Sequence, residues 1–399
     1  MPIQIGVPKE TFPGEQRVAI TPRSCERLQK AGMTVLIESS AGVPAGYSDE
    51  DYMSHGAQIL NRVELFRSAE VIVQVRSLGA NPGAGRSDLR LFRPGQWNVG
   101  FGDPLTAPNE SAEMASAGVS SFAMELIPRI ARAQSMDAMS SMAAVAGYQA
   151  ALMAASSLPK FFPMMTTAAG TIAPAKAFVL GAGVSGLQAI ATAKRLGAVV
   201  SAYDVRPGVK EQVESVGARF VSLNVESTSS EDKGGYAKAM DEEFYQRQRE
   251  MLTAVLREHD VVTTTAAVPG RKAPILITTD MVDAMARGSV IVDVAAERGG
   301  NCELTLPGRT IVHRGVSILG PMNLPSTIPY HASQMYSANV VAFLKHLLKD
   351  ETLTPNLKDE IVRETLVTYN GEIVNEQVRD TVALFTVATP TQGNGNETV

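Results

Sequence analysis

The chain has 399 residues, of which 45% are hydrophobic and 19% are charged. This length predicts two or three domains, and this balance excludes whole-chain disorder, collagen and coiled coil. Acidic residues outnumber basic ones, 41 against 36, and lysines and arginines gather in no cluster beyond pairs, so no nucleic-acid surface is expected. The two cysteines, Cys25 and Cys302, are too few for a disulfide scaffold and favour a reducing cytoplasm.

One stretch is long enough to be tested as a membrane span. Residues 138–159 carry no Asp, Glu, Lys or Arg, and a span needs about 20 predominantly apolar residues. The stretch consists mostly of Ala, Ser, Gly and Gln, which lipid solvates poorly, so we expect a buried or domain-joining helix instead. The first ten residues lack the apolar core of a signal peptide. We therefore expect a soluble cytoplasmic protein without a direct membrane span.

The first 125 residues alternate β-rich runs with amphipathic segments. A helix is predicted over 22–32, where a proline opens and a glycine closes the pattern. Residues 77–87, rich in Gly, Ser and Asn, are expected to form a loop. Apolar runs predict strands over 4–7, 34–38, 70–75 and 120–125. Strands separated by helix-length segments indicate βαβ units and a parallel sheet.

A second alternation begins at Ala177. A strand, a glycine turn and a helix ending at Gly197 come first, and another helix is predicted over 207–217. Residues 226–240 and 388–399 are polar, and we expect a surface or ligand-closing loop and a frayed tail there. Predicted strands lie at 177–180, 199–203, 220–223, 260–265 and 289–294. The predicted fold class is α/β, with doubly wound, mostly parallel sheets.

A dinucleotide-binding fingerprint opens this second half. Gly181, Gly183 and Gly186 form a G-x-G-x-x-G pattern that follows an apolar strand and begins a helix. The first glycine permits the tight turn, the second lets the backbone approach a pyrophosphate, and the third lets helix and strand pack closely. The helix N-terminus adds free N–H groups and a positive dipole end. The pattern predicts NAD(H) binding.

An acidic residue should end the following strand, and Asp204 stands there. Its carboxylate can accept from both ribose hydroxyls and would repel a 2′-phosphate, which favours NAD over NADP. Arg206, two positions on, weakens that preference because a nearby arginine can hold a 2′-phosphate.

A polar cluster precedes the uncharged stretch. Arg129, Gln134, Asp137 and Ser140 supply hydrogen-bond donors and acceptors at the junction of the two βαβ regions, and clefts between domains are common cofactor sites. Gln134 is suited to hold a carboxamide. On spacing alone, a structural cluster of caps and ion pairs at a helix start is equally compatible.

Other catalytic patterns are missing from the sequence. The five histidines, residues 55, 259, 313, 331 and 346, are scattered without H-x-H or H-E-x-x-H spacing, and no metal site is predicted. There is no G-x-S-x-G turn and no Walker lysine motif.

Several longer strings carry a family resemblance. PKETFPGEQRVAITP, PRIARAQSMDAMSSMAAVAGYQAAL, FPMMTTAAGTIAPAKAFVLGAGVSGLQAIATAKRLGA, DVRPGVKEQVESVGA, GGYAKAM and GSVIVDVAAERGGNC run in this order along the chain. Together they resemble the NAD(H)-binding component (domain I) of proton-translocating nicotinamide nucleotide transhydrogenases, in the alanine dehydrogenase/transhydrogenase family. The resemblance spans nearly the whole chain and is greatest to the arrangement in which this component is a separate polypeptide, the alpha-1 subunit.

The resemblance implies two Rossmann-like α/β domains joined by long helices. The first would comprise residues 1–137 and about 320–399, and the NAD(H)-binding domain would comprise residues 138–319. It also implies roles for individual residues. Arg129, Gln134, Asp137 and Ser140 would position the nicotinamide ring. The other implied cofactor contacts are Ile130, Ala131, Arg132, Gly181, Gly183, Val184, Gly186, Asp204, Val205, Arg206, Gly234, Tyr236 and Ala266.

The implied reaction is hydride transfer from NADH bound here to NADP(H), present as NADP+, on a partner subunit. Transfer between two nicotinamides needs no general acid or base, so holding the rings about 3–3.5 Å apart suffices. The implied partners are a second copy of the chain, forming a homodimer, a membrane alpha-2 subunit and an NADP(H)-binding beta subunit. The implied location is cytoplasmic, attached to the inner face of the cell membrane through those partners.

Two other functions remain open at this point. An alanine dehydrogenase shares the fold, but the positions where that family has a Lys and a His hold Gln74 and Phe101 here, while the carboxylate-binding candidate Arg17 remains. A non-catalytic NAD(H)-sensing module is the second alternative. It is kept because Trp97 and Phe101, and the 320–325 stretch, depart from the family pattern.

Overall fold

The computed structural model describes residues 2–222, 242–268, 270–347 and 354–387, and these fall into two compact units. The first unit contains residues 2–13, 17–137 and the described residues from 336 onward. The second contains residues 14–16 and the described residues of 138–335. Within the described ranges, no helix is both long and apolar enough to cross a membrane.

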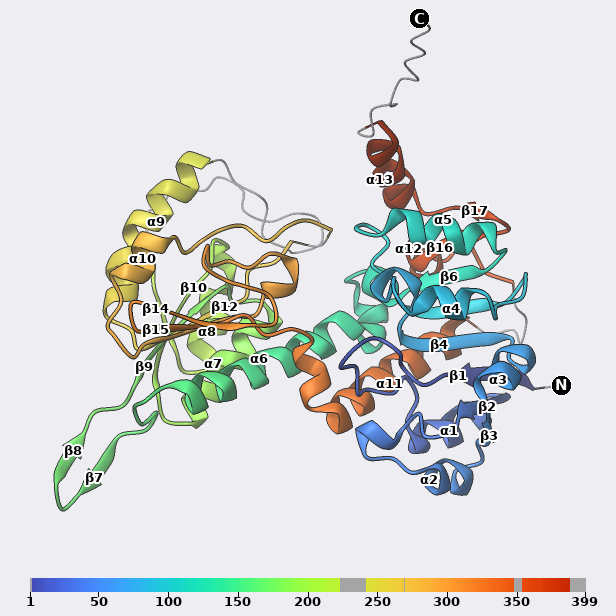
Figure 1. Cartoon of the computed structure of the whole chain (residues 1–399), viewed down its shortest axis with the longest axis horizontal. Coiled ribbons are helices and arrows are strands. Elements are labelled where there is room, and N and C mark those ends of the chain that lie inside the picture. Colours follow the sequence, from blue (N-terminus) through green and yellow to red (C-terminus); the bar gives the residue numbers. More distant parts are fainter. Residues whose placement is uncertain (1, 223–241, 269, 348–353, 388–399) are drawn as a thin grey trace, which may run out of the picture. The chain divides into compact units, whose positions relative to one another are not determined.

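The first unit is built on an eight-stranded sheet (Figure 1), with the order β17-β16-β6-β5-β4-β1-β2-β3. Strands β1 to β6 pair in parallel and follow the doubly wound order 3-2-1-4-5-6, while β16 runs antiparallel to β6 and β17 antiparallel to β16. The strands are β1 (Ile3–Val7), β2 (Met33–Glu38), β3 (Gln58–Leu60), β4 (Val71–Arg76), β5 (Trp97–Phe101), β6 (Ser120–Ala123), β16 (Leu366–Tyr369) and β17 (Glu372–Ile373).

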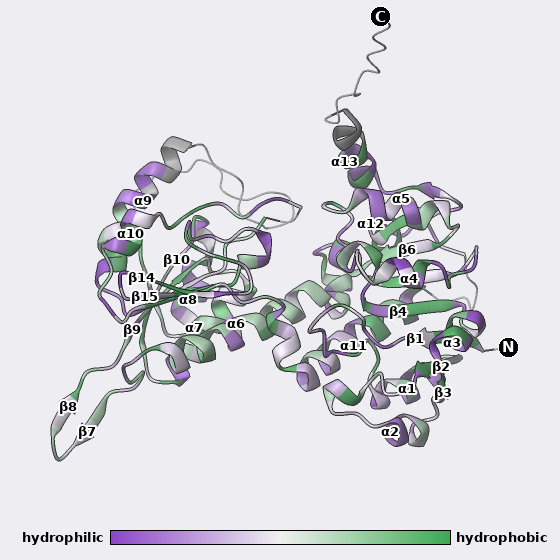
Figure 2. Ribbon diagram, viewed as in Figure 1, coloured by the Kyte–Doolittle hydropathy of each residue, from purple (hydrophilic) through white to green (hydrophobic). Residues whose placement is uncertain are grey.

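Helices on this unit begin and end at recognisable signals. Pro22 opens α1, and Ser48 caps α2 in a capping box with Asp51. The helices are α1 (Pro22–Gln29), α2 (Asp49–Ser54), α3 (Arg62–Ser68), α4 (Gly85–Leu89), α5 (Pro108–Ser116), α12 (Glu360–Thr365) and α13 (Glu376–Val387). The central strand β4 is buried over its first five residues and appears mostly green in Figure 2, as expected for a parallel strand covered on both faces.

The second unit has a seven-stranded sheet with the order β11-β10-β9-β12-β13-β15-β14. Its first six strands again pair in parallel in the order 3-2-1-4-5-6, and β14 runs antiparallel to β15 at one edge. The strands are β9 (Lys176–Leu180), β10 (Val199–Tyr203), β11 (Arg219–Phe220), β12 (Val261–Thr264), β13 (Val290–Asp293), β14 (Thr310–His313) and β15 (Val316–Leu319). A separate hairpin pairs β7 (Met165–Thr167) with β8 (Gly170–Ile172).

Two long helices mark the change between units. α6 (Ala138–Ser157) belongs to the second unit, and α11 (Pro329–Leu347) crosses the boundary at 335/336. α6 packs closely on α7 (Val184–Arg195), because a Cβ at Gly147 would lie 2.0 Å from the carbonyl oxygen of Ser185. The remaining helices of the unit are α8 (Lys210–Ser215), α9 (Glu242–Arg257) and α10 (Thr279–Asp283).

The α/β class with two mostly parallel sheets is confirmed, but several details differ from the sequence expectations. Residues 320–335 lie in the second unit, because Leu324 is buried in its core. The expected loop 77–87 contains a 3-10 turn (Leu78–Ala80) and the start of α4. Strands β3, β5, β7, β8 and β14 to β17 were not predicted. The expected loop 226–240 and tail 388–399 lie outside the described residues.

Candidate dinucleotide site

The glycine turn between β9 and α7 has the tight geometry that the fingerprint predicts. Gly181 adopts φ 99°, a conformation that side chains disfavour, and a Cβ there would lie 2.8 Å from Oγ1 of Thr265. A Cβ at Gly186 would lie 1.9 Å from the carbonyl oxygen of Gly181. Both glycines are therefore required by the close contact between strand and helix.

Gly183 differs from the other two glycines of the motif, because a Cβ there would meet no atom within 4 Å. It immediately precedes α7, whose first-turn amides face outward with the positive end of the helix dipole. The side-chain oxygen of Ser185 in that turn is buried, and it has no hydrogen-bond partner among the described residues. Open space beside backbone donors and an unpaired hydroxyl fits a pyrophosphate.

Asp204 lies directly after β10 and is buried, with 8% of its surface exposed. Its Oδ2 accepts from the amide of Ala182 in the glycine turn at 2.7 Å. Its Oδ1 accepts from the backbone N–H and the Nε of Arg206 at 2.9 and 3.0 Å, and the second guanidinium nitrogen donates to Oδ2 at 3.1 Å. The carboxylate is thus fixed against the turn, and it partly neutralises the arginine that could attract a 2′-phosphate.

The loops after β12 and β13 complete this edge of the sheet, and sequence reasoning missed most of them. The Oγ1 of Thr265 donates to the carbonyl oxygen of Gly181 at 2.9 Å. The side chain of Asn301 accepts from the amide of Ala266 at 3.0 Å and donates to its carbonyl at 2.8 Å. The Asn301 amide donates in turn to the buried Asp293 at 2.7 Å. Ala266, an expected cofactor contact, is therefore held in place, and the GSVIVDVAAERGGNC string was the available signal.

The other expected cluster lies mostly in the first unit. Gln134 lies within a 3-10 helix (Ala131–Met136), and its side chain is exposed, as is that of Arg129. Asp137 is half-buried directly after that helix, whereas Ser140 lies in the first turn of α6 in the second unit. Expected contacts Gly234 and Tyr236 lie outside the described residues.

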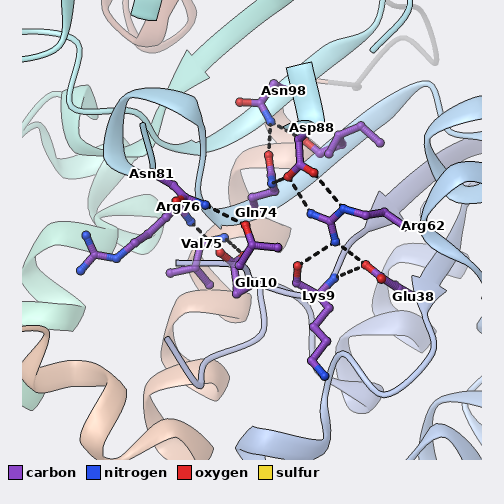
Figure 3. A network of polar contacts seen from close by, with 12 residues as sticks. Lys9, Glu10, Glu38, Arg62, Gln74, Val75, Arg76, Asn81, Asp88 and Asn98 are labelled. Atoms are coloured by element: carbon purple, nitrogen blue, oxygen red, sulfur yellow. Dashed lines mark hydrogen bonds and ion pairs between the residues drawn. The ribbon is translucent and has the colours of Figure 1, made fainter. Parts of the chain in front are cut away.

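A network of polar side chains fills the carboxyl end of the first unit's sheet (Figure 3). Arg62 donates to both oxygens of Asp88 at 2.8 and 2.7 Å and to Glu38 at 2.5 Å. The amide nitrogen of Gln74 donates to Asp88 at 3.0 Å, while its oxygen accepts from Asn98 at 3.1 Å. Burial raises the pKa of Asp88, an effect that Arg62 opposes. Gln74 is thus fully engaged by protein groups.

A carboxyl group enclosed by the protein lies near the end of β5. Glu125 accepts through Oε1 from the amides of Gly102, at 2.8 Å, and Asp103. Its Oε2 is buried and has no hydrogen-bond partner among the described residues. Burial, followed by repulsion from Asp103, raises the pKa of Glu125 from 4.5 to about 7 despite these bonds. Sequence offered no signal for this group.

No group of three or more His, Cys, Asp or Glu side chains within the described ranges is arranged to hold a metal ion. Two of the histidines form acid pairs: His313 lies 2.7 Å from Asp283 and His346 lies 3.0 Å from Asp359. The chemistry available at the glycine turn is therefore binding and orientation by backbone amides, Asp204 and the loops around Ala266.

Two doubly wound sheets, one of them carrying an intact glycine turn with an acid at the end of the next strand, define a Rossmann-type dinucleotide-binding protein. The family models narrow the class. The alanine dehydrogenase/PNT N-terminal domain matches residues 6–146, and the alanine dehydrogenase/PNT C-terminal domain matches residues 150–376. The chain belongs to the alanine dehydrogenase/PNT family.

Individual relatives agree with this assignment. The chain is 44% identical over 378 residues to the first portion of NAD(P) transhydrogenase subunit alpha, a separate protein of Rhodospirillum rubrum, and the match covers 94% of this chain and 98% of the relative. The crystal structure of a transhydrogenase from Sinorhizobium meliloti matches with a TM-score of 0.81 at 40% identity, covering 94% of this chain and 99% of that one. An L-alanine dehydrogenase structure matches with a TM-score of 0.80 at 25% identity, covering 96% and 99%. The resemblance seen in the sequence is confirmed.

Proposed function

We propose that this chain is the NAD(H)-binding subunit of a proton-translocating NAD(P) transhydrogenase, and that it passes hydride from NADH to NADP+ held by a partner subunit. The observation that carries the proposal is the 44% identity to the transhydrogenase alpha protein of Rhodospirillum rubrum over 98% of that relative's length. The open Gly183, the unpaired hydroxyl of Ser185 and the buried Asp204 give the chain a site that fits the pyrophosphate and ribose of NAD(H).

In this proposal the chain's residues bind and orient, and no acid or base is required. When bound, the reduced nicotinamide supplies the hydride. The first-turn amides of α7 hold the phosphates, and Asp204 accepts from the adenosine ribose. Gln134 and Arg129, whose exposed side chains carry amide and guanidinium donors, orient the carboxamide end, with Asp137 and Ser140 supporting them. Orientation alone accounts for a large share of such a rate enhancement.

The polar network of the first unit supports hydride transfer between nicotinamides over alanine oxidation. Oxidising an amine requires a proton acceptor, and a lysine supplies one in the family pattern. Gln74 stands at that position with both ends of its amide occupied by Asp88 and Asn98. Phe101 stacks on Tyr336, with ring centroids 5.2 Å apart, where the family pattern has histidine. These side chains offer no proton acceptor, although Arg17 is present and buried.

The assembly forms part of the proposal. The chain would form a homodimer and would bind a membrane alpha-2 subunit and an NADP(H)-binding beta subunit, which would keep it at the inner face of the cell membrane in the cytoplasm. The hairpin β7–β8 is a candidate dimer contact. All six of its strand residues are exposed, including Met165 and Ile172, and isolated two-stranded hairpins are marginally stable in water.

The direct test mixes this protein with NADH and a transhydrogenase NADP(H)-binding domain loaded with thio-NADP+. Hydride transfer is followed by the absorbance of the reduced thio analogue. We expect rapid transfer that disappears when either protein is omitted. NADH binding without any transfer, with this domain and with a native membrane extract, would favour the NAD(H)-sensing alternative. Transfer to pyruvate and ammonium would favour the alanine dehydrogenase.

A further inference from the structure

The segment of the first unit that carries Gln134 cannot fix its own position. It is a six-residue 3-10 helix, Ala131–Met136, without a side-chain N-cap. Its backbone bonds are few, from Ala133 to Ile130 at 3.0 Å and from Asp137 to Gln134 at 3.4 Å. Hydrogen bonds of this kind have poor geometry, so short 3-10 helices depend on their surroundings. Contacts from neighbouring elements must therefore hold the segment in place.

Two polar contacts from the C-terminal part of the first unit reach this segment. The guanidinium of Arg132 donates to Oδ2 of Asp359 at 2.6 Å, with Glu360 3.7 Å from its other nitrogen. The side-chain amide of Asn339, on α11, donates to the carbonyl oxygen of Ser135 at 2.9 Å. One contact lies near each end of the helix, so together they fix its position and its rotation.

Asp359 is a junction rather than a simple surface acid. Its Oδ1 accepts from the amides of Ile361 and Val362, capping α12, and from Nε2 of His346. Its Oδ2 is left for Arg132. Burial acts to raise the pKa of Asp359, but the hydrogen bonds from Arg132 and His346 outweigh it and hold that pKa well below its usual range. The carboxylate is therefore ionised whenever the protein is folded at ordinary pH.

We propose that Asp359 and Asn339 are positioning residues for the segment that carries Gln134, and that Arg132 acts as a tether to Asp359. This inference rests on the proposed function, because the purpose of the positioning is to align Gln134 with the nicotinamide. A salt bridge of this exposure contributes little to stability. Its removal should therefore disturb alignment much more than folding, and small misplacements are costly for hydride transfer.

The test uses the full-length chain with the variants Asp359→Asn and Asn339→Ala. Asparagine caps helices as well as aspartate does, so Asp359→Asn preserves the start of α12 while it removes the charge opposite Arg132. The matched control is Glu113→Gln, which weakens an ion pair of similar exposure with Arg86, 2.8 Å away, on the same unit.

The measurements are the hydride-transfer rate at saturating NADH with the partner domain, the NADH dissociation constant, and the thermal midpoint. We expect Asp359→Asn to lower the rate about tenfold to about a hundredfold while NADH binding changes by less than about threefold. The control variant should match wild type. An unchanged rate, or equal losses in rate, binding and thermal midpoint, would overturn the positioning role.

Amide hydrogen exchange separates this inference from the proposed function. In Asp359→Asn and Asn339→Ala, the amides of Ala133 and Asp137 should exchange at least about fivefold faster than in wild type and in the control. If wild type transfers no hydride, the proposed function fails and the exchange data alone decide whether these residues hold the segment. Unchanged exchange in both variants would show that they do not.

Discussion

The enclosed carboxyl group of Glu125 should make the stability of the first unit depend on pH. Its pKa is raised from 4.5 to about 7, so the folded chain binds this proton more tightly than the unfolded chain does. Unfolding therefore releases a proton between these values, and the free energy of unfolding decreases as pH rises through that window. A difference of about 2.5 pKa units corresponds to about 3 kcal/mol. Below the window the group is protonated in both states, and the cost disappears.

The variant Glu125→Gln isolates this effect, because glutamine mimics the protonated carboxyl and its Oε1 still accepts from Gly102 and Asp103. The expected result is that Glu125→Gln gains stability relative to wild type as pH rises from about 5 to about 8, by about 2 to 3 kcal/mol. The first unit's unfolding in urea can be followed by Trp97, the sole tryptophan of the sequence, which is 2% exposed in β5. A difference between the two proteins that stays constant across this range, or that falls with pH, would refute the buried-charge reasoning.

The nucleotide site gives the remaining predictions. Gly183→Ala should weaken NADH binding about tenfold, measured by fluorescence titration, without changing the thermal midpoint, since its Cβ meets no protein atom. Gly186→Ala should lower the free energy of unfolding of the second unit by at least about 2 kcal/mol, because its Cβ would lie 1.9 Å from a carbonyl oxygen; an undisturbed midpoint would contradict the packing. Asp204→Asn should raise NADPH affinity relative to NADH about tenfold by releasing the charge of Arg206, and an unchanged ratio would show that Arg206 does not reach the 2′ position. Gln134→Asn should slow hydride transfer while leaving NADH binding within about threefold, and equal transfer rates would exclude Gln134 from ring positioning.

The sequence predicted the elements whose signal is local. β9, the glycine turn and α7 were predicted because an apolar run, three glycines and an amphipathic pattern lie next to one another. Strand β16 was not predicted, because its place depends on pairing with the distant β6. The same reason hid Asn301, whose contacts to Ala266 depend on the sheet bringing two loops together, and Asp359, whose role depends on Arg132. The roles of Gln134 and Ser140 are still predictions, since the two residues belong to different units.

The two sheets share one strand order, yet they use their switch points in different ways. In the second unit, three residues connect β9 to α7, and Gly183 leaves the space beside the helix N-terminus open. In the sheet of the first unit, fourteen residues, 8–21, lie between β1 and α1. Within them, Glu10 accepts from the amides of Val75 and Arg76 at the end of β4, at 2.6 and 3.2 Å (Figure 3). The connection therefore binds the backbone donors at the switch point of the first sheet with its own carboxylate.

That difference bears on the function directly. A dinucleotide needs a short turn and free amides where the strand order reverses, and in this chain the second unit supplies both. In the first unit the corresponding end of the sheet is further filled by Gln74, Asp88 and Arg62. An amino-acid oxidoreductase of this fold would need reactive groups at that place, whereas a subunit that only presents NADH to a partner needs none. The buried network thus agrees with a subunit whose chemistry is binding and alignment.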